Sequence, residues 1–139
     1  MKIINPEALS QPRGYSNGVL FEGGSVLFVA GQIGWDRESR IVSDGFAEQF
    51  AQALENVLAV VREAGGGPEN IGRLLIFVTD SEEYSASRRD IGAAYQQLMG
   101  KHFPSMTLVE VSRLLEPLAK VEIEALAVIT NPVSGGKQK

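Results

Sequence analysis

Two long amphipathic helix patterns place the strongest constraint on the fold of this chain. Between residues 43 and 68, apolar residues recur at the three- and four-residue spacing of one helix face: Phe46, Phe50, Leu54, Val57, Leu58 and Val61. Ser43 or Asp44 is expected to cap this helix, and the glycines at 65–67 followed by Pro68 to end it. A second pattern runs from residue 81 to Gly100, and its face is formed by Tyr84, Arg88, Ile91, Tyr95 and Leu98. Because each helix has a single apolar stripe, each must pack against an apolar sheet face.

The segments around these helices predict the strands of that sheet. Residues 19–22 and 25–31 indicate a hairpin with Gly23 and Gly24 in the turn, and residues 73–80 indicate a buried strand. Two alternating strands follow, at residues 105–113 and 120–129. We therefore predict an α/β fold, more narrowly an α+β two-layer sandwich with one mixed sheet packed against two helices. Residues 1–131 should form a single domain that starts with an extended arm, and the Gly-rich tail, 132–139, should be disordered.

Strand alternation divides the last two strands into faces. Met106, Leu108, Glu110 and Ser112 point one way in the first strand, and Glu122, Glu124, Leu126 and Val128 share a face in the second. Leu126 and Val128 are expected on the sheet face without helices, where exposed apolar side chains favour self-association. Glu110 and Glu124 either pair with Arg113, Lys120 or a cation of a neighbouring subunit, or one carboxylate holds a water in a pocket between subunits.

Composition excludes several classes of function. The 139 residues carry a net charge of -4 and no run of Lys or Arg, which argues against a nucleic-acid partner. With no cysteine and one histidine, His102, thiolate chemistry is excluded, and a metal site or a Ser-His-Asp triad is disfavoured. His102 is expected in a loop or helix cap. The absence of a signal-peptide pattern or a membrane-spanning apolar run favours a cytoplasmic protein with no membrane partner.

Several segments, in this order and at this spacing, resemble the YjgF/RidA (reactive intermediate deaminase) superfamily over nearly the whole chain. The segments are GYSNGV (14–19), VAGQIG (29–34), QALENVLAVVREAG (52–65), FVTD (77–80), FPSMTLVEV (103–111) and VEIEALAV (121–128). The resemblance implies a chorismate-mutase-like fold, a homotrimer with a central barrel, and a small-molecule cleft at each subunit boundary. It also implies hydrolysis of enamines and imines, such as 2-aminoacrylate and its imine tautomer, to a 2-keto acid and ammonia, with no metal and no organic cofactor.

Four residues of the chain match functional positions of the family. The resemblance implies that Tyr15 projects into the cleft, that the backbone of Gly31 faces the ligand, and that Pro104 opens the ligand-binding strand. It also implies that Glu122 is the catalytic carboxylate, which orients the attacking water.

Three positions depart from the family pattern. Met106 replaces the arginine that binds the substrate carboxylate, Leu108 stands where cysteine is common, and Gly92 stands where the second helix often has asparagine. Because charge-assisted hydrogen bonds contribute about 1.5–3 kcal/mol each, we expect weak or no activity on 2-aminoacrylate. Arg13 is either a substitute anchor or an exposed loop residue. Trp35 either lines a pocket, together with Met106 and Leu108 as an aromatic–aliphatic rim, or covers a sheet edge.

Two functions remain open at this point. One is an imine or enamine hydrolase for a small reactive metabolite other than 2-aminoacrylate, supported by Tyr15, Gly31 and Glu122. The other is a non-catalytic trimer that binds a metabolite or a partner protein, supported by the loss of the arginine. An RNA-directed role, attached to some relatives, is disfavoured by the acidic charge.

Overall fold

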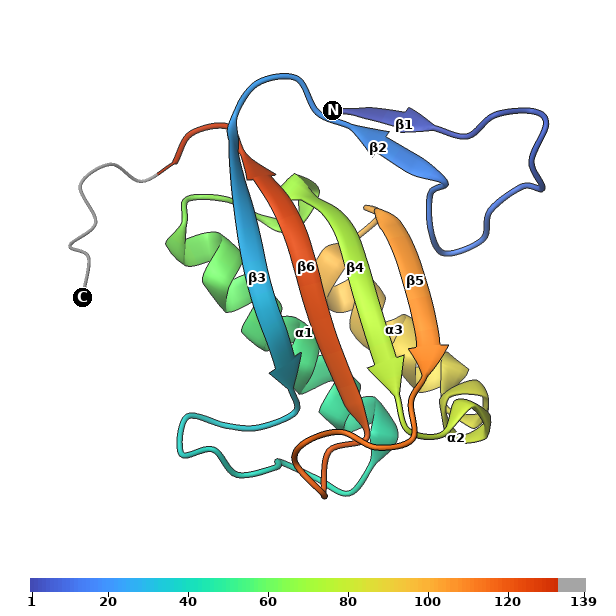
Figure 1. Cartoon of the computed structure of the whole chain (residues 1–139), viewed down its shortest axis with the longest axis vertical. Coiled ribbons are helices and arrows are strands. Elements are labelled where there is room, and N and C mark those ends of the chain that lie inside the picture. Colours follow the sequence, from blue (N-terminus) through green and yellow to red (C-terminus); the bar gives the residue numbers. More distant parts are fainter. Residues whose placement is uncertain (133–139) are drawn as a thin grey trace.

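The four-stranded sheet forms one layer of the molecule and the helices form the other (Figure 1). The structure is a computed structural model that describes residues 1–132. The strand order is β3-β6-β4-β5, with β6 antiparallel to β3 and β4, and β4 parallel to β5. The strands are β3 (Ser25–Ile33), β4 (Ile71–Val78), β5 (Ser105–Glu110) and β6 (Val121–Ile129). The predicted mixed sheet is therefore confirmed.

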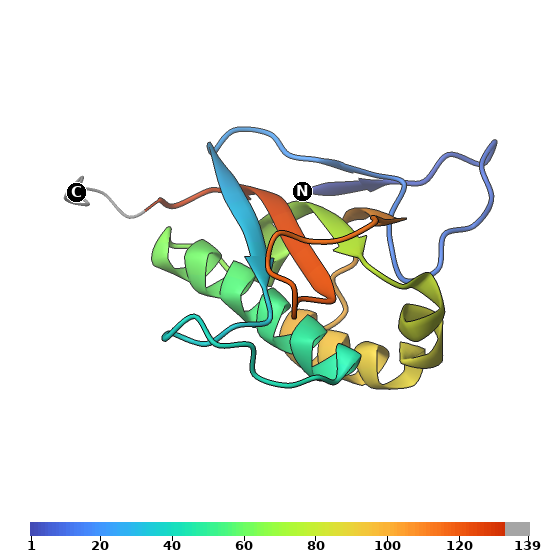
Figure 2. The same ribbon diagram turned by 60° about the horizontal axis from the view of Figure 1, so that its bottom comes forward.

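Helices α1 (Phe46–Glu63) and α3 (Arg88–Met99) both cover the same face of the sheet (Figure 2). The apolar stripe predicted for the first helix is completely or almost completely buried. It meets the inward side chains of β6, which are Val121, Ile123, Ala125 and Ala127 as alternation predicted. Each fully buried leucine here contributes roughly 1.5–3 kcal/mol to folding relative to an exposed one. This shared core confirms the two-layer sandwich.

The predicted hairpin at residues 19–31 is wrong. Strand β2 (Gly18–Leu20) pairs antiparallel with β1 (Lys2–Ile4), in the segment expected to be an extended arm, and forms a separate two-stranded sheet. After β2 the chain crosses toward β4, where the Phe21 ring lies 3.1 Å from the position of a Cβ added to Gly72. Gly23 and Gly24 therefore connect two sheets instead of two paired strands.

The second helix begins where the sequence indicated but is interrupted. Helix α2 (Ser81–Ala86) is separated from α3 by Ser87, and the Asp80 carboxylate caps α2 by accepting hydrogen bonds from the Glu82 and Glu83 N–H groups at 2.9 and 3.3 Å. At α1, Gly45 occupies the N-cap position, so neither Ser43 nor Asp44 caps the helix. Gly100 ends α3 with φ of 64°, as expected.

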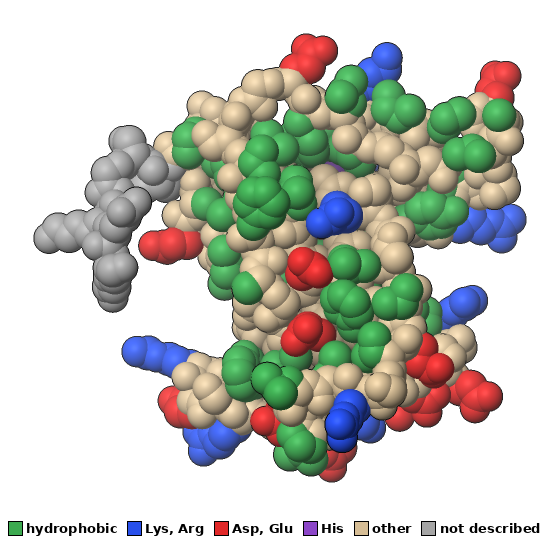
Figure 3. Space-filling view, viewed as in Figure 1, with side chains coloured by type: hydrophobic (Ala, Val, Ile, Leu, Met, Phe, Trp, Pro, Cys, Tyr) green, Lys and Arg blue, Asp and Glu red, His purple; other side chains and the backbone are tan. Residues whose placement is uncertain are grey.

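Leu126 and Val128 lie on the sheet face without helices, as predicted, but the most exposed apolar side chains of this face are others. Val128 is 8% exposed, because Gly24 lies against it, and Leu126 is half-buried. On the neighbouring strand β3, Val26 is 57% and Phe28 77% exposed. Figure 3 shows this face, with hydrophobic side chains gathered over β3 and charged ones toward the middle. Disorder was predicted for residues 132–139, and all of these except Pro132 lie outside the described residues.

Candidate functional site

A cleft with a volume of about 800 Å³ opens between α3 and the β5 edge of the sheet. Its walls come from the segment before β2, from both layers of the core and from the turn after α3. The lining residues are Arg13, Gly14, Phe50, Ile76, Tyr84, Arg88, Ile91, Gly92, Tyr95, Gln96, Gly100, Lys101, Phe103 and Met106. A cleft of this size is in the usual range for small-molecule sites.

Met106 and Leu108 point from β5 toward the helices and pack against the core, as alternation predicted. Met106 also lines the cleft, whereas Leu108 does not. Met106 presents a thioether, a weak acceptor that cannot donate a hydrogen bond. This wall therefore cannot bind a carboxylate in the way an arginine would.

Hydrogen bonds from Ser16 hold the N-terminal segment beside β5. Its N–H donates to the Pro104 carbonyl at 3.0 Å, and its hydroxyl donates to the Phe103 carbonyl. This docking brings Arg13 into the cleft wall, where it is also an exposed loop residue, so both sequence interpretations of Arg13 stay open. Tyr15 lies in the same segment, but its side chain is 37% exposed and is not among the lining residues.

Gly31 and Glu122 form a second group, on the sheet face without helices. A Cβ added to Gly31 would lie 2.8 Å from the Glu122 Cδ and 2.9 Å from its Oε2. Any side chain at position 31 would therefore displace the carboxylate. Glu122 is half-buried and forms no ion pair within residues 1–132. Its carboxylate is free to accept hydrogen bonds from a water or a ligand.

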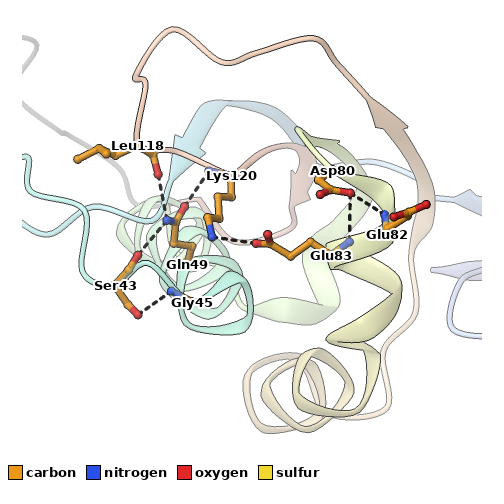
Figure 4. A network of polar contacts seen from close by, with 8 residues as sticks. All are labelled: Ser43, Gly45, Gln49, Asp80, Glu82, Glu83, Leu118 and Lys120. Carbon is orange, nitrogen blue, oxygen red and sulfur yellow. Dashed lines mark hydrogen bonds and ion pairs between the residues drawn. The ribbon is translucent and has the colours of Figure 1, made fainter.

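Gln49 positions the start of the strand that carries Glu122 (Figure 4). The buried amide donates to the carbonyls of Ser43 at 2.9 Å and Leu118 at 3.1 Å, and accepts from the Lys120 N–H at 2.9 Å. Gln49 is not among the residues predicted from the sequence to have a functional role. The available signal was a polar side chain at position 49, one turn from Phe46 and beside Phe50 on an otherwise apolar helix face.

The predicted rim of Trp35, Met106 and Leu108 does not form within one chain. Trp35 follows β3, where its backbone bridges to Ile41. Because β3 and β5 lie at opposite edges of the sheet, Trp35 and Met106 are separated by two strands (Figure 1). At its own edge Trp35 accepts a hydrogen bond from Asn56 through its carbonyl at 3.0 Å.

Within residues 1–132 Glu110 pairs with neither Arg113 nor Lys120, and pairing with a cation of a neighbouring subunit stays a prediction. Its carboxylate accepts a hydrogen bond from the Ser81 N–H at 2.8 Å, at the start of α2. The Lys120 ammonium instead pairs with Glu83 at 3.1 Å (Figure 4). A carboxylate near a helix start interacts favourably with the helix dipole, so Glu110 has a structural role.

His102 and Tyr95 hold the turn between α3 and β5. The His102 Nε2 lies 2.7 Å from the Ile71 carbonyl oxygen, and the Tyr95 hydroxyl donates to the His102 carbonyl at 2.6 Å. Burial raises the pKa of Tyr95 well above its ordinary value. Both groups are used within the fold, in agreement with the expected loop position of His102.

Within residues 1–132, no group of three His, Cys, Asp or Glu side chains could hold a metal ion. In the same part of the chain, no helix is both long and apolar enough to cross a membrane.

Comparison with known proteins identifies the family. Residues 6–129 match the family described as Endoribonuclease L-PSP, and the chain belongs to this family, which is the YjgF/RidA family of the sequence analysis. The chain is 35% identical over 108 residues to the 2-iminobutanoate/2-iminopropanoate deaminase of Salmonella typhimurium, covering 76% of this chain and 80% of that protein.

Two solved structures are similar to the whole fold. A Rid-family protein of unknown function, YyfB from Yersinia pestis, matches with a TM-score of 0.82 at 30% identity, covering 92% of this chain and 98% of that one. Escherichia coli TdcF with bound serine matches with a TM-score of 0.67 at 31% identity and the same coverage of both chains. The α+β architecture is thus that of the Rid proteins.

Proposed function

We propose that this protein is an imine deaminase that hydrolyses a 2-imino acid, with Glu122 orienting the attacking water. The observation that carries the proposal is the pair formed by Gly31 and Glu122. A glycine leaves the space that the carboxylate occupies, and the carboxylate has no cation partner within residues 1–132. A relative at 35% identity is named for this type of reaction.

The reaction needs little more than a positioned water and a polar pocket. The water oxygen bonds to the imine carbon, and the proton that the water loses passes to the imine nitrogen. The carbinolamine then loses ammonia as its C–N bond breaks, and the carbon becomes the carbonyl of a 2-oxo acid. Glu122 accepts a hydrogen bond from the water and directs its lone pair toward the imine carbon.

The active form in this proposal is a homotrimer. Glu122 lies on the sheet face without helices, and Met106 lies in the cleft on the opposite side of the sheet, so one chain cannot bring them together. Association through that face would cover Val26 and Phe28 and place Glu122 near the cleft of a neighbouring copy. In solution we expect three copies of the 15.0 kDa chain.

Ammonia release from freshly generated imines tests the reaction. Glu122→Gln keeps the shape of the side chain but weakens its acceptor, and the rate should fall at least tenfold. Glu124→Gln is the matched control, two residues further along the same strand face, and should retain the rate. Equal rates in the two variants, or no release above buffer from any imine, would refute the assignment.

Met106 favours a second function, in which the trimer binds a metabolite without converting it. A thioether replaces the donor that would bind a small substrate carboxylate. Stabilisation of the protein against heat by a compound that is recovered unchanged, without ammonia release from its imine, would support this alternative. On either function, we expect little or no release of ammonia from 2-aminoacrylate.

A further inference from the structure

We infer that the cleft beside α3 binds a 2-imino acid with an aromatic or other large apolar side chain, and that Arg88 binds its carboxylate. The inference rests on the proposed function, because it names the substrate class of that reaction. It follows from the charge of the lining residues, from the helix that carries Arg88, and from the empty space at Gly92.

The charged side chains that line the cleft are all cations. Arg13, Arg88 and Lys101 contribute to its walls, and none of its lining residues is Asp or Glu. Within residues 1–132 none of these three cations forms an ion pair. A local excess of positive charge in a chain with a net charge of -4 favours an anionic ligand.

Arg88 is the best placed of the three cations to bind a carboxylate. Arg13 and Lys101 lie in connecting segments, whereas Arg88 begins α3. Ile91 and Tyr95 follow at helical spacing and line the same cleft, so the face of α3 that starts with Arg88 forms one wall. A guanidinium can bind a carboxylate through two parallel hydrogen bonds, and a helix holds it more firmly than a loop.

Gly92 leaves room for the ligand next to this arginine. Glycine destabilises the interior of a helix relative to alanine, yet a Cβ added to Gly92 would meet no atom within 4 Å, and its φ is not positive. Nothing within the described chain therefore requires glycine at this position. The missing side chain widens the cleft one turn after Arg88, where the body of a bound molecule would lie.

The remaining walls fit a ligand whose side chain is apolar and preferably aromatic. Phe103 stacks on Tyr95 with ring centroids 5.5 Å apart and an angle of 10° between the rings, and 38% of Phe103 stays exposed at the cleft. Met106 forms the β5 wall with a flexible, polarisable side chain that adapts to bulky partners. An aromatic ring could extend the existing stack while its carboxylate reaches Arg88.

The stable 2-oxo acids that the proposed reaction would produce allow binding to be tested without catalysis. By titration calorimetry, phenylpyruvate should bind at least tenfold more tightly than pyruvate. Arg88→Gln should weaken phenylpyruvate about tenfold or more and leave the uncharged analogue phenylacetone within about twofold. Arg89→Gln is the matched control, because the neighbouring arginine does not line the cleft.

A second variant tests the space at Gly92. Gly92→Leu should weaken phenylpyruvate at least tenfold while raising the melting temperature, because leucine favours the helix and the added side chain enters the cleft. Equal binding of pyruvate and phenylpyruvate, no binding of either, or equal effects of Arg88→Gln and Arg89→Gln would overturn the inference. If the predicted binding pattern holds while Glu122→Gln leaves ammonia release unchanged, the ligand class stands and the proposed catalysis fails.

Discussion

Replacing Gln49 with methionine removes the buried amide that joins three backbone segments. The resulting decrease in the free energy of unfolding can be worked out from the hydrogen bonds that are lost. Methionine has a similar length and volume but cannot replace the amide's donors and acceptor, so the change opens little cavity. The carbonyls of Ser43 and Leu118 and the Lys120 N–H lose their partner. At about 1 kcal/mol for each bond, and more where the partner stays buried, the free energy of unfolding should fall by about 3 kcal/mol.

Chemical and thermal denaturation measure this loss, which corresponds to a decrease in melting temperature of roughly 10 °C for a chain of this size. Gln52→Met is the matched control on the same helix. Its amide makes one hydrogen bond, to the Asn56 side chain at 2.9 Å, so the loss should stay below about 1 kcal/mol. If the free energy of unfolding fell no more in Gln49→Met than in Gln52→Met, the predicted cost of the three lost hydrogen bonds would be wrong. Water would then have replaced those bonds.

Three further predictions concern the sheet face without helices and the turn after α3. Gly31→Ala should leave the melting temperature almost unchanged, because the flexible Glu122 carboxylate can move aside, but should reduce ammonia release about 10–100-fold by displacing that carboxylate; an unchanged rate would contradict the role of the pair. Phe28→Glu, at a side chain that is 77% exposed in the single chain, should abolish the proposed trimer in size-exclusion chromatography while the chain stays folded. A trimer that persists in this variant would show that the interface lies elsewhere. Tyr95→Phe should lower the free energy of unfolding by about 1 kcal/mol at neutral pH. Burial raises the pKa of Tyr95 above its ordinary value of 10.0, so the contribution of Tyr95 to the free energy of unfolding is complete below pH 10 and is lost at higher pH. The wild type should therefore lose more stability than the variant in alkaline titrations. Parallel curves of stability against pH for the two proteins would be evidence against this.

The layers of the fold could be predicted from the sequence because they depend on local periodicity. Apolar residues recur at helical spacing from Phe46 to Val61, and buried residues alternate with partly exposed ones along most of β6. Each pattern therefore identifies the buried face of its element. Pairing partners are not local properties. Val19 pairs with Ile3 instead of β3, and the Phe21 ring lies near Gly72, so the partners of this segment are distant in the sequence.

The candidate site could be predicted only as separate residues. Family motifs identified Gly31, Glu122 and Met106, but strand order decides whether such residues meet, and strand order is set by tertiary packing. Gln49 and Arg88 were missed as site residues for a related reason. Each lies within a pattern interpreted as a helix face, and its hydrogen bonds or its place in the cleft depend on segments distant in the sequence.

The attachment of Ser16 to the backbone of residues 103 and 104 covers the start of an edge strand, and we expect it to limit aggregation there. Strand β5 is the outermost strand of its sheet, and its backbone groups would otherwise offer a template on which a strand of another molecule could add. Ser16 bridges to Ser105 at the start of that strand. Proteolytic removal of residues 1–16 would therefore expose unpaired backbone at this margin, and the shortened protein should form insoluble assemblies more readily than the intact chain.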